Sequence, residues 1–257
     1  MRIRDAQIDE LRKAPLQVFE NEMVVHLAEF SPPLFRAVKE EQLRKVIRFG
    51  MARADTYGIT FRGPIRLYLE LMLLFGSHFD TDPQYPWAGK ILRDRDSAPQ
   101  MERAERIYEK TLDYREKVAG DLDEYTLKAL RRISDLAQKP LAFPSGGLVN
   151  AMLAEMGEVY PEKTEYLGEA TLRLLINQGL AIAEKNKFST DHAIALPVVL
   201  MFAFGHGCFD DPLYPWIAKT MNDEAITDPE ARAKRLEKKA LTWLNHVLAY
   251  FNEDIKK

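Results

Sequence analysis

The side chains best suited to chemistry gather in two short stretches of the chain. The first stretch carries His78, Asp80 and Asp82, and the second carries His206, Asp210 and Asp211. Imidazole and carboxylate groups placed together can hold a divalent metal ion or exchange protons with a substrate. When the stretches are aligned without gaps, only Asp82 and Asp211 fall opposite each other. Metal ligands should survive as a complete set in at least one stretch, so the sequence favours neither a metal nor another cofactor.

The two aligned aspartates have a structural interpretation. Asp82 and Asp211 each stand directly before a proline. An aspartate in that position can accept backbone N–H groups of its own turn and can favour the positive end of the next helix. We therefore expect Asp82 and Asp211 to shape turns. The alternative is an acidic contact surface that they form together with Asp80 and Asp210.

Aromatic residues follow both aspartates at the same spacing. They are Tyr85, Trp87, Tyr214 and Trp216. Tyr and Trp dominate the hot spots of protein interfaces, so these rings are candidates for contact with a partner. A repeated Pro-Trp at the start of a helix can instead lock that helix against its neighbour. The sequence favours packing and leaves partner contact open.

The remaining reactive groups indicate no enzyme class. The sequence contains no HExxH, paired CxxC, GxSxG, phosphate-loop or dinucleotide-binding pattern. Its single cysteine, Cys208, has acidic neighbours, which oppose the lowered pKa that a nucleophilic thiol needs. We expect Cys208 to be an inert thiol and the protein not to be an enzyme.

A longer pattern surrounds these stretches, because Leu71–Trp87 (LMLLFGSHFDTDPQYPW) returns as Leu200–Trp216 (LMFAFGHGCFDDPLYPW). Trp87 and Trp216 stand 129 residues apart, and residues 43–94 and 172–223 share 19 of 52 positions at that offset. Average composition would give roughly one match in sixteen. The sequence therefore predicts two tandem homologous units, an N-terminal one over 1–119 and a C-terminal one over 148–257, joined by a connection over 120–147.

Hydrophobic residues recur at helical spacing throughout both units. The first unit predicts a helix over 19–30, a second over 34–57, and a very apolar third from Gly63-Pro64. A short fourth helix should begin at Pro86 and a long fifth after Ser97, with Asp228 capping its copy. We expect an all-α fold with about five helices in each unit and a connecting helix over 121–138.

Glycine and proline positions add local expectations. Gly50 and Gly179 sit within predicted helices, where glycine costs about 1 kcal/mol relative to alanine. Another helix should therefore cross closely at each of them. Pro15 should interrupt the first amphipathic stretch, and Pro197 should kink the apolar helix of the second unit.

Composition limits the classes of partner. The chain has 257 residues with 46% hydrophobic and 29% charged residues, which is ordinary for a folded globular protein. A net charge of −3 gives no general attraction to nucleic acid or anionic lipid. The N-terminus lacks the apolar core of a secretory signal, and the longest apolar run, 193–204, is too short to cross a bilayer. We expect a cytoplasmic protein with no membrane insertion.

The repeated pattern also resembles a known family. The motifs are Tyr57-Gly58-Ile59, then Leu71-Met72-x-x-Phe75-Gly76, then Phe79-Asp80-x-Asp82-Pro83-x-x-Pro86-Trp87. They resemble an uncharacterised bacterial family associated with type VI secretion effector clusters, near spike, PAAR-type and adaptor genes. The second unit departs from the pattern, because Asn186-Lys187-Phe188 replaces Tyr-Gly-Ile and only 201–216 matches closely. The resemblance implies a cytoplasmic accessory protein and supplies no catalytic residue.

Three functions remain open on these observations. The first is an adaptor or co-chaperone that holds a secreted effector or its adaptor. The second is an immunity protein whose acidic residues neutralise a basic toxin cleft. The third is a metal-dependent enzyme that uses the His and Asp residues of the turns. In the first two cases the partner is a protein, and a homo-oligomer is possible.

Overall fold

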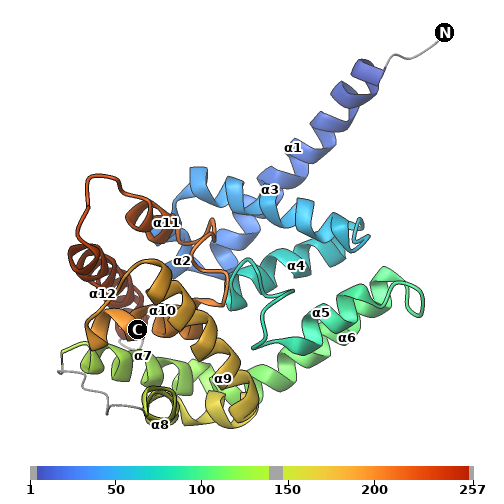
Figure 1. Ribbon diagram of the computed structural model, residues 1–257. Coiled ribbons are helices and arrows are strands. Elements are labelled where there is room, and N and C mark those ends of the chain that lie inside the picture. The colour runs from blue at the N-terminus through green and yellow to red at the C-terminus, as the bar shows by residue number, and fades with distance from the viewer. Residues whose placement is uncertain (1–4, 139–146, 255–257) are drawn as a thin grey trace.

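The computed structural model describes the backbone of residues 5–138 and 147–254 and the side chains of 15–138 and 147–251. Within these ranges the chain forms twelve α-helices and no β-strand, so the predicted all-α fold is confirmed. Figure 1 shows the N-terminal part of α1 extending away from the other helices. None of the described helices combines the length and hydropathy needed to span a bilayer.

Six helices lie before the connection and five after it. The earlier ones are α1 (Asp5–Phe30), α2 (Pro32–Val38), α3 (Glu40–Thr56), α4 (Arg62–Phe75), α5 (Pro86–Arg93) and α6 (Gln100–Tyr114). A π turn, Arg115–Ala119, and a 3-10 turn, Asp121–Asp123, lead into the connecting helix α7 (Glu124–Leu136). The later ones are α8 (Leu148–Val159), α9 (Pro161–Lys185), α10 (Asp191–Phe204), α11 (Pro215–Met221) and α12 (Pro229–Asp254).

Helix boundaries recur at the offset of 129 residues that separates Trp87 from Trp216. Residues 40–56 of α3 correspond to 169–185 of α9, and 62–75 of α4 correspond to 191–204 of α10. Below, residues up to 119 are the first half, residues from 148 are the second half, and two residues 129 apart are counterparts.

Two breaks in the helices are also counterparts. Lys39 separates α2 from α3 with φ 66° and ψ 159°, and Gly168 breaks the course of α9 with φ 74° and ψ 158°. The single helix expected over 34–57 is therefore wrong. Its break lies at a lysine in a backbone conformation that L side chains rarely adopt, which residue type alone does not indicate.

The predictions for prolines within helices and for helix caps were confirmed only in part. Helix α1 runs through Pro15 without ending, because this proline is exposed and water can satisfy the carbonyl that it frees. Helix α10 likewise continues through Pro197. Helix α6 begins after Pro99, so Ser97 is not its cap. Asp228 does cap α12, since its carboxylate accepts the N–H of Ala231 at 2.9 Å.

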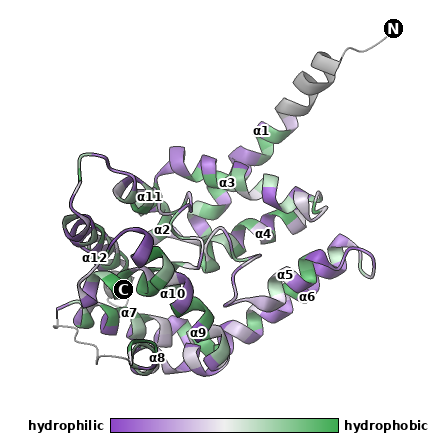
Figure 2. Ribbon diagram, in the orientation of Figure 1, coloured by the Kyte–Doolittle hydropathy of each residue, from purple (hydrophilic) through white to green (hydrophobic). Residues whose placement is uncertain are grey.

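The centre of each half is its apolar helix, α4 or α10. Helix α4 crosses α3 at Gly50, where an added Cβ would lie 2.4 Å from Leu69 Cδ2. Helix α10 crosses α9 at Gly179, where an added Cβ would lie 2.9 Å from Val198 Cα. The predicted close crossings are confirmed. Buried residues of both halves belong to one hydrophobic cluster, and Figure 2 shows hydrophilic residues alternating with hydrophobic ones around outer helices such as α3 and α12.

Candidate functional site

The turns that follow α4 and α10 meet at the junction of the two halves. Asp82 Oδ2 accepts the backbone N–H of His206 at 2.6 Å. Asp211 Oδ2 accepts the backbone N–H of Ser77 at 2.7 Å, and Asp211 Oδ1 accepts the Ser77 hydroxyl at 2.5 Å. Ser77 and His206 are counterparts, as are Asp82 and Asp211. Each aspartate therefore binds the turn of the opposite half.

The same carboxylates also organise their own turns. Asp82 Oδ1 accepts the N–H of Gln84, and Asp211 Oδ1 accepts the N–H of Leu213, both at 2.8 Å. Gln84 extends the junction, because its side-chain amide donates to Met201 O at 3.0 Å. The same side chains thus form the local turns and join the two halves. The sequence indicated the turns but not the contact between the halves.

Glycines before the two turns let the backbones approach. Gly76 and Gly205 have φ of 91° and 93°, a conformation that suits glycine. A Cβ on Gly76 would lie 2.5 Å from Phe204 O, and one on Gly205 would lie 2.8 Å from Phe75 O. The junction therefore excludes a side chain at both positions.

Burial removes these aspartates from contact with a substrate. Asp82 and Asp211 are each only 2% exposed. Desolvation raises the pKa of both carboxyl groups, while the donated hydrogen bonds act in the opposite direction. Their acceptor positions are filled by groups of the chain itself, so the geometry gives them a role in joining the halves.

The four candidate acidic residues do not form one surface. Asp80 is buried and accepts hydrogen bonds from Arg53 at 2.6 Å and from the Tyr57 hydroxyl at 2.8 Å. Burial, and then the hydrogen bond to Asp80, raise the pKa of Tyr57 to about 12. Only Asp210 among the four is exposed. The acidic contact surface weighed in the sequence analysis is therefore absent from these residues.

The candidate aromatic residues lie in two matching clusters. In the first, Phe75 contacts Tyr85, Trp87 and Tyr114, with ring centroids 4.4–6.0 Å apart. In the second, Phe204 contacts Tyr214, Trp216 and Trp243 at 4.6–6.1 Å. Tyr85 and Tyr214 are buried, and both tryptophans are half-buried. Packing accounts for these contacts.

One member of each aromatic cluster was not predicted from the sequence. Tyr114 and Trp243 are counterparts in α6 and α12. Both are aromatic at equivalent positions of the two halves, and that signal was present in the alignment. Ser77, Arg53 and Gln84 were also overlooked, because small or polar residues carry no pattern that identifies a buried hydrogen bond.

The histidines of the two stretches meet across the junction. The ring centroids of His78 and His206 lie 6.4 Å apart, and His206 Nε2 is 3.1 Å from the Thr81 hydroxyl. Burial, followed by the charge of Arg53, lowers the pKa of His78. In the part of the chain that the structure describes, no three His, Cys, Asp or Glu side chains are grouped to hold a metal ion. Burial raises the pKa of Cys208, which makes its thiol a poor nucleophile.

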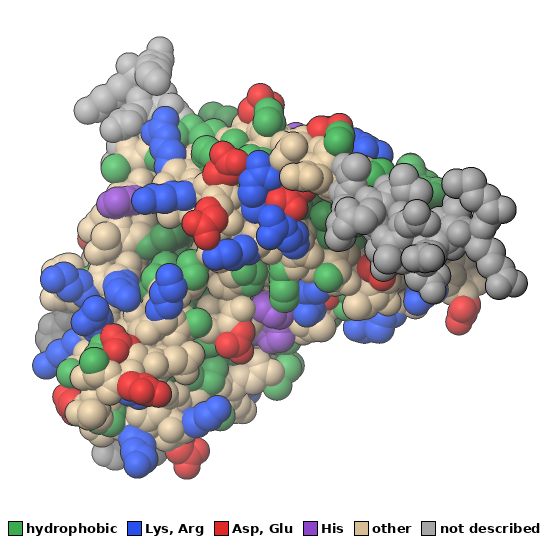
Figure 3. All heavy atoms as spheres, turned by 90° about the horizontal axis from the view of Figure 1, so that it is seen from above, with side chains coloured by type: hydrophobic (Ala, Val, Ile, Leu, Met, Phe, Trp, Pro, Cys, Tyr) green, Lys and Arg blue, Asp and Glu red, His purple; other side chains and the backbone are tan. Residues whose placement is uncertain are grey.

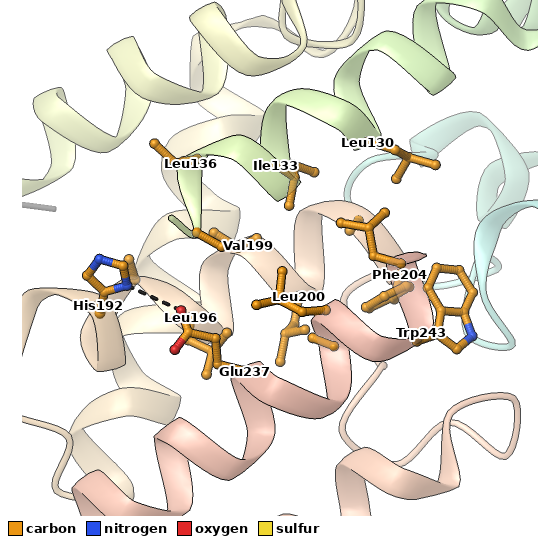
Figure 4. Close-up of a pocket in the computed structure, with 16 residues that line it drawn as sticks. Leu130, Ile133, Leu136, His192, Leu196, Val199, Leu200, Phe204, Glu237 and Trp243 are labelled. Atoms are coloured by element: carbon orange, nitrogen blue, oxygen red, sulfur yellow. Dashed lines mark hydrogen bonds and ion pairs between the residues drawn. The ribbon is translucent and has the colours of Figure 1, made fainter. Parts of the chain in front are cut away.

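A groove in the second half holds the connecting helix α7. Figure 4 shows Leu130, Ile133 and Leu136 of α7 directed toward the apolar side chains of α10 and α12. Hollows of about 80 and 50 Å³ remain beneath α7, and its three side chains are only half-buried. Helix α7 is thus an amphipathic helix that is loosely seated in an apolar groove.

The corresponding surface of the first half is exposed. It carries four hydrophobic side chains, Phe30, Leu74, Tyr108 and Leu112, which are 37%, 40%, 52% and 49% exposed. We call these four residues the open face. Their counterparts, Val159, Ala203, Glu237 and Leu241, line the hollows around α7. Because their counterparts surround one helix, we infer that these four side chains share one surface, and exposed apolar surfaces are typical of interaction sites.

On the face drawn in Figure 3, charge does not single out another surface. Figure 3 shows acidic and basic side chains interspersed over the face seen from above. Comparison with protein-family models, with curated protein sequences and with solved structures finds no match to this chain. The open face and the α7 groove are the features on which the proposed function rests.

Proposed function

We propose that this chain is a non-enzymatic accessory protein that binds an amphipathic helix of a protein partner on the open face. One observation carries this proposal. Leu74, Tyr108 and Leu112 are exposed at positions whose counterparts in the second half line the groove of α7. Covering an apolar surface of this kind with a helix removes it from water and lowers the free energy of the complex.

Helix α7 indicates the chemistry of the partner. Its apolar residues Leu127, Leu130 and Ile133 follow one another at intervals of three along the helix. A partner helix with the same spacing would place its apolar residues on Leu74 and Leu112. The Arg66–Glu70 ion pair of 3.0 Å on α4 occupies positions whose counterparts, Ala195 and Val199, line the α7 groove, so the partner helix should place polar residues opposite this pair.

The proposal includes a duplication. We infer that residues 1–119 and 148–257 are tandem homologous units joined by 120–147. The recurrent helix boundaries, the paired breaks at Lys39 and Gly168, and the reciprocal bonds of Asp82 and Asp211 support this inference. Only the second unit receives the connecting helix, which leaves the first unit's surface for a partner.

The resemblance to the family found in type VI secretion effector clusters suggests the partner's identity. We propose that the protein acts in the cytoplasm as an adaptor or co-chaperone for a secreted effector. The alternative is an immunity protein, but the acidic residues that it would use are buried except for Asp210. A metal-dependent enzyme is less well supported, because Asp82 and Asp211 are occupied at the junction.

Deletion of the gene in its own host separates these functions. The adaptor proposal predicts that the cluster's effector disappears from the culture medium while sister cells grow normally. The immunity alternative predicts continued secretion and the poisoning of sister cells. Unchanged secretion together with normal growth would contradict both.

A further inference from the structure

A cavity of about 420 Å³ lies between the two halves. Its walls include Phe75 and Tyr114 from the first half and Phe202 and Trp243 from the second. Ligand pockets in proteins commonly measure about 300–1,000 Å³ and are mostly apolar with a few polar groups. Leu74 and Arg115 line the cavity and are exposed, so it reaches the surface.

One cation lies within these apolar walls. Lys163 of α9 is 5% exposed, and its Nζ donates to Phe202 O at 2.6 Å and lies 4.5 Å from the centroid of the Phe202 ring. Among the described residues that carbonyl is its one hydrogen-bond acceptor, although an ammonium group has three N–H bonds. Its counterpart is Leu34, so this position does not require a polar side chain for packing.

A buried ammonium group without a carboxylate partner is unfavourable. Burial lowers the pKa of Lys163 to about 8, and the charge of Asp82 acts in the opposite direction. Lys163 is therefore mostly protonated at neutral pH and presents a positive charge to the cavity. An anion with an apolar body would neutralise this charge and cover the aromatic walls.

We propose that the cavity between the two halves binds a medium-chain alkyl carboxylate. Its carboxylate would accept hydrogen bonds from Lys163 Nζ, and its alkyl chain would lie along the aromatic side chains from Phe75 to Trp243. The cavity shares Phe30 and Leu74 with the open face, whereas Tyr108 and Leu112 do not line it, so variants at Tyr108 and Leu112 test the partner site separately.

Other ionisable groups also face the cavity, but they do not bring a net charge to it as Lys163 does. Burial raises the pKa values of four tyrosines that line the cavity, Tyr85, Tyr114, Tyr160 and Tyr214. Ser31, Thr126 and Tyr250 also line it. Arg115 and Asp123 bind each other at 3.1 Å. The four tyrosines with raised pKa values thus stay neutral as the pH rises through 8, and the Arg115–Asp123 pair brings no net charge.

Calorimetric titration of the full chain with decanoate and with decanol tests the proposal. We expect one decanoate per chain, bound at least tenfold more tightly than decanol below micellar concentrations. Lys163→Leu should abolish that preference, whereas Lys90→Leu, which removes an exposed charge outside the cavity, should retain it. Equal binding of the two compounds by the wild-type chain, or a preference that survives in Lys163→Leu, would overturn the proposal.

A pH series on the wild-type chain provides a test that needs no variant. The protonated amine binds the carboxylate, so affinity for decanoate should fall as the pH rises above about 8, while affinity for decanol stays constant. A preference for decanoate that does not change between pH 7 and pH 10 would exclude Lys163 as its partner.

Discussion

At the residue scale, Asp82 and Asp211 each perform two tasks with one carboxylate. One oxygen accepts an N–H of the aspartate's own turn, and the other accepts an N–H of the opposite half. A hydrogen bond to a charged group contributes about 1.5–3 kcal/mol, and an unsatisfied buried donor is costly. These two residues therefore contribute to stability well beyond a local turn.

Exchange of one aspartate for asparagine tests this role. In Asp211→Asn an amide NH₂ would face the N–H donors of Ser77 or Leu213, so we expect a loss of about 1–3 kcal/mol in the free energy of unfolding. The matched control is Asp210→Asn, because Asp210 is the exposed neighbour. Urea unfolding followed by circular dichroism measures both. Equal stability of the two variants would contradict the junction role.

The sequence identified these aspartates but only half of their contacts. An Asp-Pro dipeptide indicates a turn because its donors are close in sequence. The donors from Ser77 and His206 are separated from their acceptors by 134 and 124 residues, and any backbone N–H serves equally well. A sequence therefore cannot distinguish these donors from other main-chain groups.

At the element scale, the start of α10 is fixed by a side chain from α12. Glu230 Oε1 accepts the N–H of Ser189 at 2.7 Å, and Glu230 Oε2 accepts the Thr190 hydroxyl at 2.7 Å. Gln100 makes similar contacts in the first half, where its Oε1 accepts the N–H groups of Thr60 and Phe61. The Thr190 hydroxyl and the donors of Ser189 lower the pKa of Glu230 to about 2.

The lowered pKa of Glu230 predicts that the folded chain loses stability as the pH falls. The Glu230 pKa is about 2 in the folded chain, against an ordinary value of 4.5. Its contribution to stability is fully present above about pH 4.5 and is lost as the pH falls toward 2. Glu230→Gln, which copies the chemistry of Gln100, should be less stable than the wild type at pH 7, with a difference that shrinks between pH 5 and pH 3. Thermal unfolding across that range measures the difference, and a constant gap would refute the assignment.

The sequence predicted helices better than the breaks within them. Hydrophobic spacing located α3, α4 and their counterparts because burial imposes that spacing. The break at Lys39 was not predicted because lysine gives no turn signal, and its glycine counterpart, Gly168, was not considered. Pro15 predicted an interruption of the first helix, but α1 continues through this exposed proline.

At the scale of the whole molecule, the halves share one core and meet where Gly76 and Gly205 admit no side chain. Gly205→Ala should lower the free energy of unfolding by about 2 kcal/mol or more, because its φ of 93° and ψ of 155° suit glycine alone. Gly157→Ala is the control, since a Cβ there meets no atom within 4 Å and alanine should stabilise α8 by about 1 kcal/mol. Denaturant titration of both variants measures these opposite changes in the free energy of unfolding. A tolerated alanine at Gly205 would mean that the halves are not held this closely.

The open face provides the most direct test of the proposed function. In the deletion strain, the gene would be restored as wild type, as Tyr108→Glu with Leu112→Glu, or as Leu174→Glu, and the cluster's effector in the culture medium would be quantified. Leu174 is a matched control because it is 47% exposed on α9, outside the open face. We predict that the wild type and Leu174→Glu restore secretion and that the open-face variant, although folded, does not. Full secretion with the open-face variant would contradict the account.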